Sequence, residues 1–155
     1  MNTLKGNPKT DILTQELWAR LFRAESLDGF LAENGDACEL PAFSDYITEL
    51  CRVKGEKPER ILKRGNIESS FGHRLFSGIR RPSRDTVLQL AFGFELNMEG
   101  TQQLLKVAHA TALHPKVRRD AVIAYYLYHQ GTLTDVQQAL YENDLPLIGG
   151  ARDGN

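Results

Sequence analysis

The apolar residues of this chain recur mostly at the three- and four-residue spacing of an α-helix, and no segment alternates convincingly as a surface strand does. The clearest stretch is 43–53, where one helical face collects the apolar residues Phe43, Tyr46, Ile47, Leu50 and Val53. Gly55 ends this helix. Pro58 suits the first position of the next helix, because its missing N–H would be unpaired there in any case. The pattern predicts an all-α protein.

Cap and turn residues divide the remainder of the chain into further helices. The predicted helices cover about 14–24, 26–34, 58–64 and 68–77, then one capped by Ser83, one capped by Asn97, one over 116–130, and a last one that Thr134 and Gln137 begin as a capping box. We expect three regions: an acidic N-terminal helical extension over 1–41, a core over 42–110, and a C-terminal helical hairpin with its tail over 111–155, packed on the core.

The predicted C-terminal hairpin has an aromatic-rich face. We expect that face to complete the core through Ala121, Val122, Tyr125 and Tyr126. If part of it is exposed instead, it is the natural surface for a homodimer. The tail from 145 to 155 is predicted to be a loop.

Charge is distributed unevenly, although the formal net charge is only -1. Residues 1–50 carry four Lys and Arg against nine Asp and Glu, residues 51–90 carry ten against four, and residues 91–155 carry five against seven. A basic excess confined to one segment is what phosphate binding requires, but a solvated surface beside acidic neighbours has the same composition.

Composition narrows the class of protein further. Hydrophobic residues make up 41% of the chain, which allows a buried core, and no apolar run approaches the roughly 18 residues that span a bilayer. The N-terminus lacks the apolar segment of a secretion signal, so we expect a cytoplasmic protein with no membrane association. Cys38 and Cys51 fit neither a disulfide framework nor a metal spacing, and the four histidines are scattered. We predict no metal site and no cofactor.

The segment from Lys57 to Ser83, KPERILKRGNIESSFGHRLFSGIRRPS, predicts two short helices joined by a tight turn and followed by arginines. It resembles the helix-turn-helix of the lambda-repressor-like (Cro/repressor, XRE) family of bacterial and phage regulators. The resemblance covers about 43–107 and implies a five-helix lambda-repressor-like core, to which this chain adds N-terminal helices and a C-terminal hairpin. It also implies that the helix at about 68–77 enters the DNA major groove.

Three positions depart from the family pattern in a related way. Leu62 stands where the family has a small residue, Asn66 where it has the turn glycine, and Gly72 where it has a facing Ile or Val. Asn tolerates a left-handed turn better than other non-glycine residues. We expect Leu62 and Gly72 to exchange sizes across one contact, which keeps the packed volume nearly constant.

When the family's helix-turn-helix is aligned with this segment, the resemblance implies which residues contact DNA. Its base-reading positions fall on Ser69, Ser70 and Arg74, with His73 beside them, and its backbone phosphate contacts fall on Ser77, Arg80, Arg81 and Arg84. Arg74 is the best candidate, because a guanidinium grips guanine O6 and N7 with two hydrogen bonds. Glu68 is able to accept from cytosine. Phe71 either completes the core or packs on a thymine methyl group.

Two functions fit these observations. The first is a sequence-specific DNA-binding transcriptional regulator, whose partner is double-stranded DNA. The resemblance also implies a two-fold homodimer, which is common in this family. The alternative is a protein–protein interaction adaptor that retains the scaffold and binds a protein partner through its N-terminal or C-terminal helices. The sequence contains no phosphate-binding loop, nucleophile elbow or clustered acid–base pair, so we do not expect an enzyme.

Overall fold

The computed structural model describes residues 14–150, which divide after Pro41 into two units. These residues contain no strand, and their helices are α1 (Thr14–Arg23), α2 (Leu27–Asn34), the 3-10 helix η1 (Gly35–Cys38), α3 (Phe43–Lys54), α4 (Pro58–Arg64), α5 (Ser69–Ser77), α6 (Arg84–Gly93), α7 (Met98–Val107), α8 (Arg118–Tyr128) and α9 (Leu133–Glu142). The predicted all-α class is confirmed. No helix within this range is long and apolar enough to cross a membrane.

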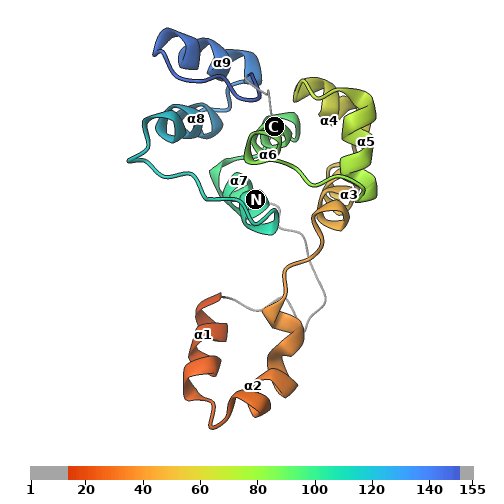
Figure 1. The fold of residues 1–155 in the computed structure, drawn as a ribbon, viewed down its shortest axis with the longest axis vertical. Helices are drawn as coiled ribbons and strands as arrows, with labels where there is room; N and C mark the ends of the chain where they lie inside the picture. Colours follow the sequence, from red (N-terminus) through yellow and green to blue (C-terminus); the bar gives the residue numbers. More distant parts are fainter. Residues whose placement is uncertain (1–13, 151–155) are drawn as a thin grey trace. The chain divides into compact units, whose positions relative to one another are not determined.

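The N-terminal unit consists of α1, α2 and η1 (Figure 1). Ser26 caps α2 as predicted, because its hydroxyl accepts a hydrogen bond from the Gly29 N–H at 3.0 Å. The unit buries few side chains: Phe30 and Asn34 of α2 are buried, whereas no residue of α1 is. This unit therefore has almost no core of its own.

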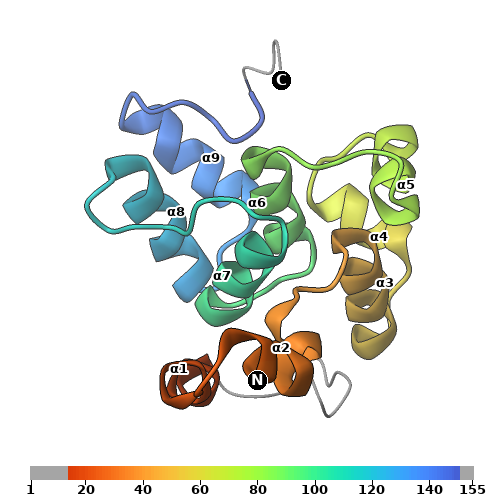
Figure 2. The same cartoon turned by 60° about the horizontal axis from the view of Figure 1, so that its bottom comes forward.

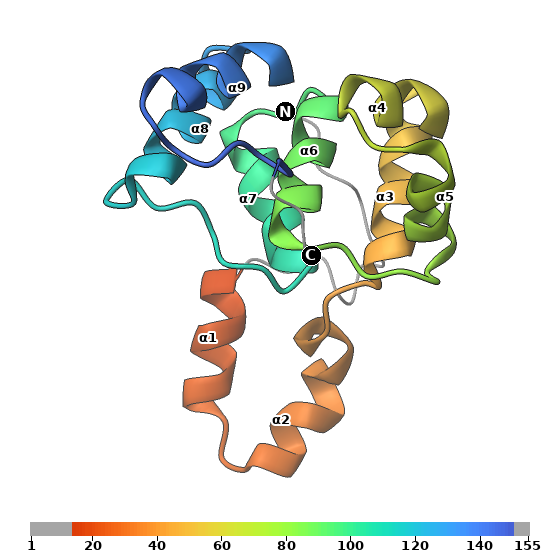
Figure 3. The same ribbon diagram turned by 45° about the horizontal axis from the view of Figure 1, so that its top comes forward.

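The C-terminal unit places α6 and α7 between two other groups of helices. Figures 1, 2 and 3 show α3, α4 and α5 on one side of this central pair, and α8 and α9 on the other. The contacts agree, because α6 packs on α4, α7 and α9, and α7 packs on α8. The deepest side chains come from all these groups and include Ile47, Ile61, Leu75, Leu88, Leu104, Ile123 and Leu140.

Most predicted helix ends in the C-terminal unit are confirmed. Gly55 ends α3 in the left-handed conformation (φ 68°), and Pro58 opens α4. The Ser83 hydroxyl accepts from the Thr86 N–H at 3.1 Å, and the Asn97 side chain accepts from the Gly100 N–H at 2.8 Å. These caps are short-range features, which explains why the sequence alone predicts them.

The predicted exchange of sizes between α4 and α5 is present. A Cβ atom added to Gly72 would lie 2.4 Å from both methyl carbons of Leu62, and Leu62 itself is only 2% exposed. Asn66, in the turn between the two helices, has φ 54°, the left-handed conformation expected of it. Leu62 thus fills the space that a side chain at position 72 would otherwise occupy.

The prediction for the buried face of α8 is wrong. Asp120, Ile123 and Leu127 are its buried residues, whereas Tyr125 is 56% exposed. The other three predicted core residues are only half-buried (Ala121, Val122 and Tyr126). Positions 120, 123 and 127 follow the helical spacing of a single face, which turns Tyr125 outward. The helix is also shorter than the predicted 116–130.

The prediction for the start of α9 is wrong, because its capping box is formed by Thr132 and Asp135, two residues before the expected start. Thr132 accepts a hydrogen bond from the Asp135 N–H at 3.2 Å, and the Asp135 carboxylate accepts one from the Thr132 N–H at 2.8 Å. The expected box of Thr134 with Gln137 does not form, because the Gln137 side chain instead hydrogen-bonds the backbone of Ile148. The earlier start prevails because it brings Leu133 into the helix on the buried face that Val136 continues.

Two crossed ion pairs join the first turns of α6 and α8. Arg84 donates to the Asp120 carboxylate at 3.1 and 3.0 Å, and Arg119 donates to the Asp85 carboxylate at 3.1 and 3.1 Å. The segment 145–150 lies against this junction, because Asp85 also accepts the Gly149 N–H at 2.8 Å. The predicted tail loop is thus fixed to the protein over these residues, while 151–155 lie outside the described residues.

Both cysteines are free thiols in very different surroundings. Cys38 is exposed, and Cys51 is buried on the inner face of α3. Burial, with a smaller contribution from Glu56, raises the pKa of the Cys51 thiol to about 11. Cys51 is therefore a neutral packing residue at ordinary pH.

The Leu62–Gly72 contact yields a test of the fold. We expect Gly72→Ile to destabilise the protein by about 1–3 kcal/mol through overpacking. Leu62→Ala alone should cost about 2–5 kcal/mol, because it leaves a cavity. The double variant should be more stable than the sum of the two single effects, because each change relieves the other. Urea unfolding of the four proteins measures this, and strictly additive effects would contradict the contact.

The Asp85 ion pair yields a test by pH. Burial by itself would raise the pKa of this carboxyl group, but the hydrogen bonds from Arg119 and Gly149 more than offset burial and hold the pKa below its ordinary value of 3.8. A lowered pKa in the folded protein contributes stability above that ordinary value, and this contribution is lost as the pH falls through the lowered pKa.

We therefore expect Asp85→Asn to destabilise the protein by about 1–3 kcal/mol near pH 7. The difference from the parent protein should shrink as the pH falls below 3.8. Urea unfolding across this range, followed by circular dichroism, measures the difference. A difference that stays constant to the lowest pH would show that the charge of Asp85 is not what stabilises the junction.

Candidate nucleic-acid interface

Helix α5 turns the predicted base-reading residues outward. Gly72 and Leu75 are its buried residues and face the interior. The five exposed residues of the helix are Ser69, Ser70, His73, Arg74 and Ser77. The structure therefore gathers on one exposed face the residues that the sequence assigned to bases, together with one of those assigned to phosphate.

Glu68 is the N-cap of α5. Its carboxylate accepts hydrogen bonds from the Phe71 N–H at 2.8 Å and the Ser70 N–H at 3.0 Å. These two bonds lower the pKa of the carboxyl group, so Glu68 is ionised at neutral pH. Its role in the fold is to satisfy the free amides at the start of the helix, and it needs no nucleic acid to explain its presence.

Two of the outward residues have a partner within the protein. The His73 Nε2 atom lies 3.3 Å from a carboxylate oxygen of Glu59 on α4, and both side chains are exposed. The Ser77 hydroxyl donates to the Arg74 carbonyl oxygen at 3.2 Å. No side-chain hydrogen bond or ion pair of Arg74 occurs within residues 14–150, so its guanidinium is free to bind an external group.

The turn after α5 determines where the following arginines begin. Gly78 adopts the left-handed conformation (φ 84°), and the N–H groups of Ile79 and Arg80 both donate to the Arg74 carbonyl oxygen, at 3.0 and 3.1 Å. The chain therefore reverses direction at the end of the helix.

This turn brings Arg80 back over the first turn of α5. Its guanidinium carbon lies 5.7 Å from the centre of the Phe71 ring, within the range of a cation–π contact. Phe71 is half-buried, so one part of the ring meets the interior while another supports Arg80. Phe71 thus completes the core only in part, and its contact with a thymine methyl group stays a prediction.

Arg84 serves the fold rather than the exposed surface. Its guanidinium donates to Asp120 and also to the carbonyl oxygens of Thr111 and Ala112, at 2.9 and 3.2 Å. These bonds use the donors that a phosphate contact would need. We therefore remove Arg84 from the predicted phosphate-binding residues.

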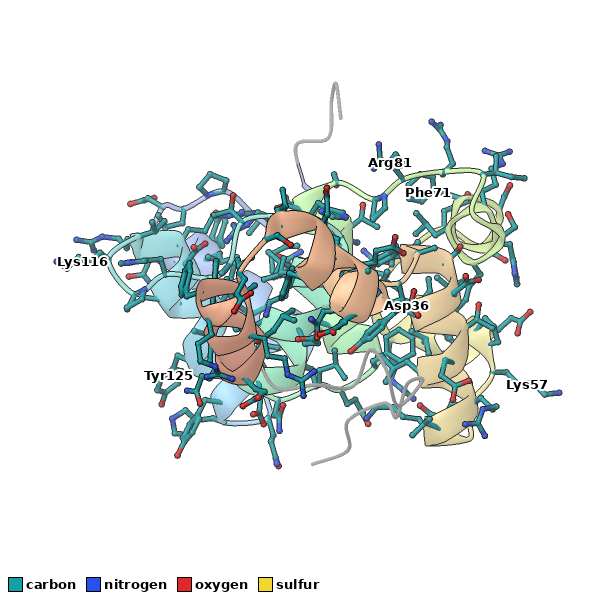
Figure 4. All side chains as sticks on the ribbon, turned by 90° about the horizontal axis from the view of Figure 1, so that it is seen from below. Asp36, Lys57, Phe71, Arg81, Lys116 and Tyr125 are labelled. Atoms are coloured by element: carbon teal, nitrogen blue, oxygen red, sulfur yellow. The ribbon has the colours of Figure 1, made fainter. Side chains whose placement is uncertain are left out.

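The ten basic residues of 51–90 divide into those that form an ion pair and those that do not. Arg52, Arg60, Arg64 and Arg84 each form an ion pair with a carboxylate. Six are exposed and have no such pair within the described chain: Lys54, Lys57, Lys63, Arg74, Arg80 and Arg81. Figure 4 shows Lys57 well apart from Phe71 and Arg81. Arg74, Arg80 and Arg81 belong to α5 or to the segment that directly follows it.

Ile79 is a surface residue that the sequence reasoning missed. It is 74% exposed, and it stands between Gly78 and the arginines. An isolated apolar residue in a turn carries no periodic signal that separates surface from interior. Its place beside Arg80 makes it the apolar part of the same surface, which we define as the α5 surface: Ser69, Ser70, His73, Arg74, Ser77, Ile79, Arg80 and Arg81.

Other kinds of site find less support. Residues 14–150 hold no cluster of three or more His, Cys, Asp or Glu side chains able to bind a metal. A cleft lies between the end of α4 and the α8–α9 turn, lined among others by Lys63, Arg64 and Thr132. Arg64 is engaged with Glu56 and the Gly93 carbonyl oxygen, so it is not free for a ligand there.

No protein-family model, curated protein or solved structure matches this chain.

Proposed function

We propose that this protein is a sequence-specific DNA-binding transcriptional regulator of the lambda-repressor-like kind, with α4 and α5 as its helix-turn-helix. The observation that carries the proposal is the α5 surface: one helix face of short polar side chains and an unpaired arginine, continued by two more exposed arginines. Serine, histidine and arginine side chains suit base edges, and nearby cations suit the phosphates on either side of a groove.

The arginines of the α5 surface have different proposed partners. Arg74 projects from the middle of the exposed face of α5, where a helix lying in the major groove meets base edges. Arg80 and Arg81 follow the helix in the turn segment, and we propose that they bind backbone phosphates. Arg81 is exposed and without an ion pair in the described chain, whereas Arg80 is supported by Phe71.

A protein-interaction adaptor is the second candidate, and exposed aromatic residues favour it. On α8, Tyr125 is 56% exposed and Tyr128 is 72% exposed, and both rings lie against His129. The same patch is our candidate surface for a two-fold homodimer. Sedimentation equilibrium that finds only monomer in the absence and in the presence of DNA would contradict the homodimer.

The division of roles among the arginines is testable. We expect Arg74→Ala to cost about 1–3 kcal/mol of specific binding and to relax the preference at one base pair, while Arg81→Ala weakens all sequences alike. Lys116→Ala is the matched control, because it removes an exposed cation that lies far from Arg81 in Figure 4. Gel-shift titration on a selected duplex and on a random one measures all three variants.

Salt separates the two candidate functions in the same experiment. DNA binding should weaken steeply as salt rises, because phosphate contacts release counterions, and Arg81→Ala should make that dependence shallower. Equal losses for Arg74→Ala and Arg81→Ala on both duplexes would remove the proposed division of roles. Absence of binding to any duplex at low salt would favour the adaptor.

The stacking of Arg80 on Phe71 gives a further test. We expect Phe71→Leu to weaken DNA binding several-fold, because the ring no longer holds the guanidinium in place. In an Arg80→Ala background the same change should have little effect, because no guanidinium is left to position. A double-mutant cycle of DNA affinities measures the coupling, with circular dichroism melts to verify folding. Full additivity would mean that Phe71 does not act through Arg80.

A further inference from the structure

The first helix of the N-terminal unit leaves its aromatic residues in solvent. Trp18 and Phe22 stack on each other with ring centres 5.4 Å apart, yet they are 54% and 74% exposed. No residue of α1 is buried. A helix of ten residues is marginal in water by propensity alone, and α1 has no fully buried side chain, so a surface that covers the stack would stabilise it.

The second helix extends the same exposed apolar character. Leu27 is 62% exposed and Leu31 is 45% exposed, while the interior of the unit consists of little more than Phe30 and a buried Asn34. Arg20 donates to the Asn34 side chain at 3.0 Å, and this hydrogen bond links the two helices. We take together the exposed apolar residues of the two helices, Trp18 and Phe22 of α1 with Leu27 and Leu31 of α2, and name them the N-terminal apolar face.

The polar residues around this face are strongly acidic. Residues 14–41 contain six carboxylates and two arginines, and all six carboxylates are exposed: Glu16, Glu25, Asp28, Glu33, Asp36 and Glu39. Among residues 14–41, Glu16 alone of these carboxylates forms an ion pair, with Arg20 at 3.3 Å. Figure 4 shows Asp36 among the labelled side chains. The unit therefore combines an uncovered apolar face with a net negative charge.

Charge decides which occupant the face fits. Duplex DNA and anionic lipid surfaces are repelled by the carboxylates. A second copy of the same unit would bring two negative units together. A partner with cationic residues around an apolar centre binds favourably for two reasons. Its apolar centre buries the aromatic stack, and its cations pair with the carboxylates around that stack.

We propose that the N-terminal unit is a docking element whose apolar face binds an amphipathic, cationic segment of another protein. Trp18 and Phe22 fill the centre of the contact, with Leu27 and Leu31 beside them. The carboxylates set the rim and select a basic partner over an acidic one. This inference does not depend on DNA binding, because the N-terminal unit and the α5 surface are made of different residues.

The full chain carries its own probe, because Trp18 is its one tryptophan. The experiment titrates the protein with a tryptophan-free amphipathic helical peptide of Leu and Lys and follows Trp18 emission. A peptide with Glu in place of Lys, and a scrambled Leu and Lys peptide of the same composition, serve as controls. We expect a saturable blue shift with the first peptide that weakens as salt rises, and no shift with the other two.

Variants connect the shift to the apolar face. We expect Phe22→Ser to weaken binding of the cationic peptide about tenfold, since central apolar residues dominate such contacts, and Leu31→Ser, beside the centre, to weaken it by a smaller factor. Tyr141→Ser is the matched control: it removes a side chain that is 72% exposed in the other unit, and it should leave the titration unchanged. Circular dichroism melts verify that the C-terminal unit stays folded in every variant.

Several outcomes would overturn the proposal. No shift with the cationic peptide, or an equal shift with the acidic one, would remove the charge-selected partner. Emission that is already blue-shifted without peptide and reddens on dilution would identify a second copy as the occupant. Blue-shifted emission that does not change on dilution would mean that the chain itself covers the face.

Discussion

The contact of Leu62 with Gly72 fixes which face of α5 points into the C-terminal unit. Because position 72 has no side chain, Leu62 reaches the backbone of α5, and the two helices pack closely across this point. Leu75, on the same inner face of α5, is fully buried. Once this face is fixed inward, the helical period leaves Ser69, Ser70, His73, Arg74 and Ser77 outside. The composition of the exposed face thus follows from one steric constraint in the interior.

A second constraint acts on the segment after α5. Gly78 ends the helix with a left-handed turn, and Ser83 begins α6 with a capping hydrogen bond. The arginines lie between these two fixed points. The crossed ion pairs at the start of α6 hold that helix to α8. The C-terminal hairpin therefore fixes the end of the segment that carries the arginines. Side chains carried on a short, fixed segment lose less conformational freedom on binding than those on a free loop.

The sequence predicts the features that depend on neighbouring residues and misses those that depend on distant ones. Gly55, Pro58, Ser83 and Asn97 act within one helical turn, and each appears where expected. The Leu62–Gly72 exchange is predictable because alignment with the family pattern places the two residues at positions that face each other. By contrast, the partner of Arg84 lies 36 positions further along the chain, and no local spacing indicates it.

The buried face of α8 and the start of α9 were missed for a different reason. Tyrosine is suited to either the interior or the surface, so the pattern around Tyr125 favours two helical faces almost equally. Two threonines with suitable third neighbours made two capping boxes available at the start of α9, and tertiary packing of Leu133 selected the first. In both places the local sequence fits two structures equally well. Packing of α8 on α7 and of α9 on α6 selects one of them.

The central claim is that the outer face of α5 reads base pairs in duplex DNA. Selection of bound duplexes from a random pool at low salt, followed by sequencing, tests it most directly. The account predicts enrichment of a short motif that contains a guanine, and loss of the preference at that position when Arg74 is replaced by alanine. A pool that stays random after repeated selection, or a motif that is unchanged by the Arg74 replacement, would contradict it.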